Sequence, residues 1–88
     1  MKNENKPVYE KRIGGVRVAI WENQNGSGIW HNVSIMRHYK DGEDWKEAST
    51  YNGLGDLALV REAVEVARDW IRRRELDDAN NADSASFS

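Results

Sequence analysis

Tryptophan, arginine, lysine and histidine side chains recur along the first half of this 88-residue chain, mostly at positions that share one face of a strand. These residues are Arg17, Trp21, Trp30, His38, Lys40 and Lys46. Aromatic rings stack on unpaired bases, at roughly 1–3 kcal/mol per base, and cations attract the phosphates between them. The six residues are therefore candidate contacts to a single strand of DNA or RNA.

Four strands are needed to bring these side chains onto one surface. Alternation of apolar and polar residues predicts strands at 8–13, 16–21, 29–40 and 44–51. Gly14-Gly15 and Asp41-Gly42 are signals for tight hairpins, because glycine adopts a positive φ without strain. Residues 23–28 (NQNGSG) have the composition of a loop. The strands are thus expected to form an antiparallel meander.

The same alternation assigns the two faces of the predicted sheet. The residues expected to pack beneath a helix are Val16, Val18, Ile20, Val33 and Ile35. The opposite face then carries the candidate contacts, with Lys46 and Thr50 contributed by the last strand. Trp45 and Tyr51 fall in phase with Glu47 and are expected to close the core under the helix, with Glu47 at an edge.

One long amphipathic helix is predicted from about Asp56 to Leu76, with Asp56 as its N-cap or first-turn acid. Its core stripe consists of Leu57, Val60, Val64, Ala67 and Ile71, widened by Ala63 and Trp70. Leu59 and Val66 form a second apolar row, which a single sheet does not need. We therefore expect Leu59, Val66 and Trp70 to form a dimer interface.

A single α+β domain is expected over residues 8–76, between a flexible arm (1–7) and a disordered, acidic and polar tail (77–88). A core of this size is marginal on its own, which favours a homodimer. No apolar run approaches the ~18 residues of a membrane span, and residues 1–7 lack a signal-peptide core. These features predict a soluble, cytoplasmic protein that does not contact membranes.

Several other kinds of site are not expected. The chain has no cysteine, and His31 and His38 would lie on opposite faces of one strand, so they could not bind the same metal ion. No nucleophile has a neighbouring base, and the glycine pairs match no phosphate-binding loop. We therefore expect a binding module with no cofactor, no metal and no small-molecule substrate, and not an enzyme.

The pattern of framework residues resembles a family of small bacterial and phage-associated proteins over residues 16–71. The matching runs are IWEN at 20–23, GIWHNV at 28–33, RHYKDG at 37–42, WK at 45–46 and DL at 56–57. The order of four strands and a helix is similar to that of the PC4-like transcriptional coactivators and the Whirly proteins. That resemblance implies a helix-mediated dimer whose curved sheets present aromatic and basic side chains to single-stranded DNA in transcription, replication or repair.

A second interpretation is a protein-interaction or assembly module that uses the same exposed face. The formal net charge is −2, and acids such as Glu22, Glu43 and Glu47 nearly cancel the strand cations. Trp21 and Trp30 could simply pack on each other across strands. Salt distinguishes the two interpretations, because phosphate binding weakens steeply as salt rises.

Overall fold

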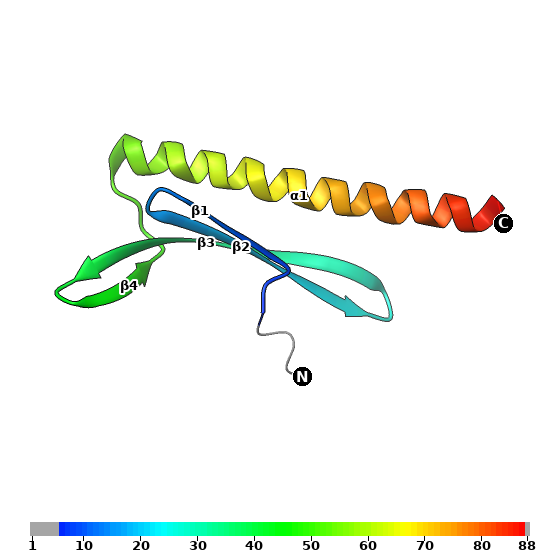
Figure 1. The fold of residues 1–88 in the computed structure, drawn as a ribbon, viewed down its shortest axis with the longest axis horizontal. Helices are drawn as coiled ribbons and strands as arrows, with labels where there is room; N and C mark the ends of the chain where they lie inside the picture. The colour runs from blue at the N-terminus through cyan, green and yellow to red at the C-terminus, as the bar shows by residue number, and fades with distance from the viewer. Residues whose placement is uncertain (1–5, 88) are drawn as a thin grey trace.

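Four antiparallel strands and a following helix make up the fold (Figure 1). The computed structural model describes the backbone of residues 6–87 and the side chains of residues 6–79. The elements are β1 (Tyr9–Ile13), β2 (Val16–Asn25), β3 (Gly28–Asp41), β4 (Asp44–Ala48) and α1 (Gly53–Phe87). The strands lie in the order β1-β2-β3-β4, so the expected α+β meander with a C-terminal helix is confirmed.

Strands β2 and β3 form a longer hairpin than the sequence predicts. Asn25 pairs with Gly28, which leaves only Gly26 and Ser27 as the loop. The side chain of Asn25 accepts a hydrogen bond from the backbone N–H of Ser27 at 2.7 Å, so a local Asx turn closes the hairpin. The prediction that 23–28 is all loop is therefore wrong, because the asparagines and Gln24 extend the ladder.

The core lies between β2 and α1. Val16, Val18 and Ile20 are 1%, 0% and 0% exposed, and they meet Ala63 and Ala67 of the helix. Alanines at the point of contact let the helix axis approach the sheet closely, which completes the burial of the β2 side chains. The predicted helix-facing residues of β2 are thus confirmed, and Ile35 of β3 packs against the same cluster.

The helix is rotated about its axis relative to the prediction. Leu59, Val66 and Trp70 pack against the chain's own core, whereas Leu57 and Val64 remain 51% and 39% exposed. The three predicted dimer contacts thus pack against the core while remaining partly exposed, and their role in a dimer stays a prediction. The reason for the rotation is that Ala63 and Ala67, rather than the larger residues of the predicted stripe, lie at the centre of the buried face.

Leu59 also fixes the β1–β2 turn. Gly14 has a φ of +60°, and a Cβ at this position would lie 3.0 Å from Cδ1 of Leu59. Both the backbone conformation and the close contact therefore require glycine here. The helix is packed onto this hairpin as well as onto the flat part of the sheet.

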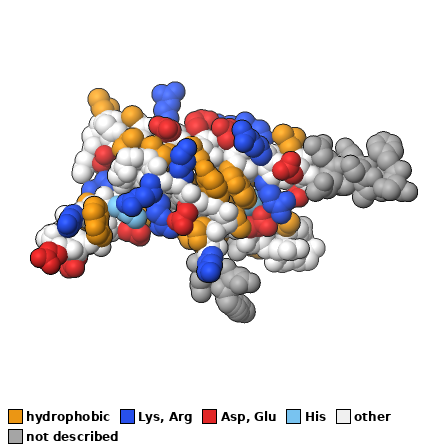
Figure 2. All heavy atoms as spheres, viewed as in Figure 1, with side chains coloured by type: hydrophobic (Ala, Val, Ile, Leu, Met, Phe, Trp, Pro, Cys, Tyr) orange, Lys and Arg blue, Asp and Glu red, His pale blue; other side chains and the backbone are white. Residues whose placement is uncertain are grey.

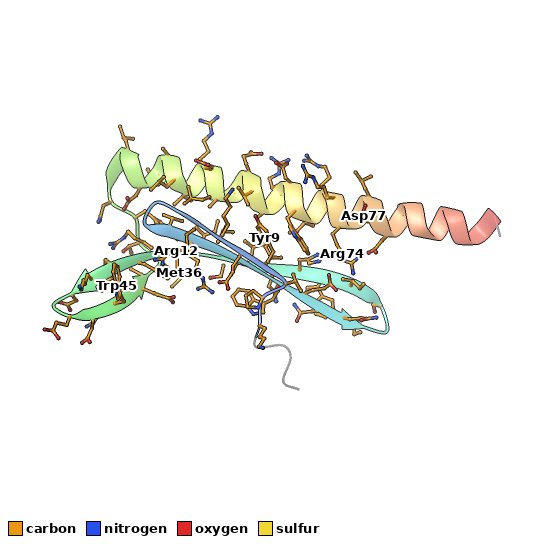
Figure 3. The ribbon with its side chains drawn as sticks, in the orientation of Figure 1. Tyr9, Arg12, Met36, Trp45, Arg74 and Asp77 are labelled. Atoms are coloured by element: carbon orange, nitrogen blue, oxygen red, sulfur yellow. The ribbon has the colours of Figure 1, made fainter. Side chains whose placement is uncertain are left out.

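Aromatic and charged contacts of Trp70 and Arg74 hold the middle of α1 on the sheet. The Trp70 ring stacks on Tyr9 with centroids 6.0 Å apart and meets His31 edge-on at 5.7 Å. Arg74 donates to Glu22 at 3.1 Å, and Nε2 of His31 lies 3.1 Å from the same carboxylate. Figure 3 shows Arg74 reaching from α1 toward the β2–β3 hairpin.

The helix begins earlier and ends later than predicted. It starts at Gly53, and the Asp56 carboxylate accepts a hydrogen bond from the backbone N–H of Asn52 at 2.8 Å. It continues beyond Leu76 to Phe87, where the sequence predicted a disordered tail. An i,i+4 ion pair between Arg74 and Asp78 links the two parts. In the described part of the chain, no helix combines the length and apolar character needed to cross a membrane.

Three glycine-to-alanine variants test the Leu59 contact. Gly14→Ala should lower the free energy of unfolding by about 2 kcal/mol, because it adds left-handed strain and displaces Leu59. Gly42→Ala, with a φ of +67° and open space around it, should cost only the strain, about 1 kcal/mol. Gly26→Ala has neither problem and serves as the control. Urea unfolding gives all three values; equal values for Gly14 and Gly42 would contradict the role of Leu59.

Acid should weaken the attachment of α1 through Glu22. The hydrogen bond from Arg74 and the nearby His31 lower the pKa of Glu22 below its ordinary value of 4.5. Its stabilisation is therefore complete above pH 4.5 and is lost as the pH falls through the lowered pKa. Glu22→Gln should cost about 1 kcal/mol at pH 7 and progressively less toward pH 3. Glu62→Gln, on the exposed side of the helix, is the control and should leave the free energy of unfolding at pH 7 near the wild-type value.

Candidate nucleic-acid interface

The sheet face turned away from α1 is not covered by a second layer in the described part of the chain (Figure 1). We call this surface the open face. Cross-strand partners share a face, so the register assigns its members. They are Glu10, Arg12, Arg17, Ala19, Trp21, Asn23, Trp30, Asn32, Ser34, Met36, His38, Lys40, Trp45 and Glu47. Five of the six predicted contacts therefore lie on one surface.

Two tryptophans expose their rings at opposite ends of the open face. Trp30 is 46% exposed near the β2–β3 turn, and Trp45 is 66% exposed on β4. Trp21 is half-buried and lies opposite Asn32, while Trp30 lies opposite Asn23, so these two tryptophans are diagonal neighbours. Trp30 and Trp45 are the rings best placed to stack on a ligand.

Trp45 corrects the sequence analysis, which placed it under the helix with Tyr51. The loop of Gly42 and Glu43 pairs Asp41 with Asp44, so Trp45 falls opposite Lys40 on the open face. Figure 3 shows Trp45 on the β3–β4 hairpin, clear of α1. The face of Trp45 could have been predicted from the Asp41-Gly42 hairpin signal. That signal indicates a two-residue loop, and such a loop fixes the register of both strands.

The two predicted lysine contacts lie on opposite faces. The Lys40 ammonium lies 5.9 Å from the centroid of the Trp45 ring, which joins a cation and an aromatic surface. Lys46 is paired with Tyr39 on the other face and forms a 3.2 Å ion pair with Asp41. The prediction that Lys46 is an open-face contact was therefore wrong. The strand register that places Trp45 on the open face places its neighbour Lys46 on the opposite face.

A cluster of charges occupies the middle of the open face. Arg17 forms ion pairs with Glu10 at 2.7 Å and with Glu47 at 3.6 Å. Arg12 donates a hydrogen bond to Nδ1 of His38 at 3.1 Å. Nε2 of the same ring lies 2.9 Å from Glu47, without the direction of a hydrogen bond. Two carboxylates thus compensate much of the positive charge contributed by the arginines.

Arg12 and Lys40 are the open-face cations that remain available. Among the described residues, neither forms an ion pair with a carboxylate. Arg12 was not among the predicted contacts, although it precedes the Gly14-Gly15 turn and its register partner is Arg17. Figure 2 shows positive and negative side chains interspersed over the visible surface, so no large region carries a single sign.

The histidines are separated as the alternation predicts. His31 lies on the helix side against Trp70, and His38 lies on the open face. Within the part of the chain that the structure describes, no three His, Cys, Asp or Glu side chains gather closely enough to hold a metal ion. The open face therefore presents aromatic rings and guanidinium, ammonium and imidazole groups.

The chain matches no protein-family model, no curated protein and no solved structure. The resemblance to PC4-like and Whirly proteins accordingly stays a prediction, and the function must be argued from the open face itself.

Proposed function

We propose that this chain binds single-stranded nucleic acid along its open face, weakly and with little sequence preference. The observation that carries the proposal is the pairing of exposed Trp45 with Lys40 at one end of β3 and exposed Trp30 toward the other. Indole rings offer bases a stacking surface without selecting among them. Ten residues of β3 separate Trp30 from Lys40, a span of about 33 Å.

Arg12 adds a further cation in the middle of the open face, between the two ends marked by Trp30 and Trp45. A phosphate there would meet a guanidinium whose present partner is an imidazole nitrogen rather than a carboxylate. Arg17 contributes less, because Glu10 and Glu47 already neutralise it. With only a few available cations, affinity should be modest and stacking should supply a large share of it. A cytoplasmic location would give the protein access to such strands.

The test is a titration of a labelled dT oligomer of about 20 nucleotides, followed by fluorescence anisotropy at low salt and at ~0.2 M salt. Trp45→Ala and Trp30→Ala should each weaken binding by roughly 5- to 100-fold, corresponding to one stacked base. Leu57→Ala, on the helix side, is the control for loss of an exposed apolar side chain. Absence of binding at low salt would overturn the proposal and leave the open face as a protein-docking surface.

Two lysines provide a matched pair of variants. Lys40→Ala should weaken binding and lower the slope of log K against log salt by about 1, because one phosphate contact is lost. Lys46→Ala changes the net charge equally but acts on the other face, so both affinity and slope should stay near the wild-type values. Equal effects would mean that net charge alone attracts the oligomer, which would contradict binding along the open face.

A further inference from the structure

The first nine of the 14 residues of β3 have no neighbouring strand on their outer side in the described part of the chain. Strand β4 pairs only with Arg37–Asp41, so the segment from Gly28 to Met36 is bordered by β2 alone among the described strands. We call this outer side the free edge. The hydroxyl of Tyr51 donates to the carbonyl of Ile35, which closes the free edge at its β4 end.

The Tyr51 contact also shows which backbone groups point outward. Because Ile35 turns its carbonyl away from β2, the alternation of an antiparallel ladder turns Ile29, His31 and Val33 the same way. Their N–H and C=O groups therefore form a row that no described strand satisfies. Such a row is a template for one more strand.

Apolar side chains accompany this row on the helix side of the sheet. Ile29 and Val33 are 41% and 42% exposed. Val66 and Arg73 of α1 border a hollow with residues of β1, so Val64, on the other flank of the helix, is turned toward β3. Val64 is 39% exposed. The free edge therefore combines unpaired backbone groups with an apolar surface on one side.

We propose that a second copy of this chain binds here, with the two β3 strands pairing antiparallel about a two-fold axis at His31. An antiparallel edge is self-complementary, so Val33 of each copy lies beside Ile29 of the other. The Trp70 ring contacts both Tyr9 of β1 and His31 of β3, so the helix axis lies over β2. With strands about 4.8 Å apart, the two helix axes then lie about 14 Å apart, on either side of a groove whose floor is formed by Ile29 and Val33 of both copies.

This geometry favours a second copy over an unrelated strand, because an identical partner presents the same outward row of backbone groups with the same apolar Ile29 and Val33 beside it. Six buried hydrophobic residues form the core cluster of the described chain, and small domains commonly gain stability by association. The pairing also joins the two open faces and places the Trp30 rings close to the two-fold axis. The role of this joined surface rests on the proposed function. The dimer would thus present one continuous track for a nucleic acid.

The test is the molar mass of the full chain at 1–100 μM by sedimentation equilibrium, without nucleic acid. We expect about twice 10.1 kDa at the upper end of this range. Val33→Lys should weaken the dimer about 100-fold or more, because each copy would bury a charge at the edge. Leu54→Lys, at an 85% exposed position near the start of α1, should leave the dimer intact. Circular dichroism verifies that both variants fold.

A wild-type chain that remains at 10.1 kDa at ~100 μM, or a folded Val33→Lys variant that dimerises like the wild type, would overturn the inference. If Val33→Lys does not fold, Val64→Lys tests the same interface from the helix. A dimer that binds no oligomer would overturn the proposed function alone. A monomer that binds the oligomer would overturn the dimer alone, so the two failures are distinguishable.

Discussion

The contact of Ala63 and Ala67 with the β2 side chains determines the rest of the molecule. Val18 and Ile20 are wholly buried only because two small residues let the helix approach. Once this face is covered, every alternate residue of β2 and β3 must point to the other side. The open face, its tryptophans and its charge cluster are thus consequences of one helix–sheet contact, supported by Trp70 and Arg74 farther along α1.

Strand order, the hairpin turns and the buried face of β2 could be predicted because alternation and turn chemistry are local signals. The rotation of α1 could not, because it depends on which side chains fit closest to the sheet, a property of tertiary packing. Trp45 is an intermediate case: its face follows from the two-residue loop of Gly42 and Glu43, yet its phase with Tyr51 predicted burial. The end of α1 was missed because composition alone does not separate a polar helix from a tail.

The ion pairs of the open face limit what it can bind. Arg17 lies between two carboxylates, so a phosphate that approached it would compete with Glu10 and Glu47. The face is therefore poorly suited to a ligand held by charge alone and better suited to one that also offers flat, apolar surfaces. Under the proposed function, the exposed tryptophans therefore supply a larger share of the affinity than the cations do.

The outer border of β1 and the unpaired border of β3 carry different side chains. Strand β1 presents Glu10, Lys11 and Arg12, charged side chains of the kind that discourage a strand from being extended by another chain. The unpaired border of β3 carries the apolar side chains of Ile29 and Val33 instead. The hydrogen bond from Tyr51 to the carbonyl of Ile35 limits this border to a few residues. Under the proposed pairing, a charged border on β1 and a short unpaired segment on β3 favour the addition of a single partner, so growth ends at a closed pair and does not continue into a filament.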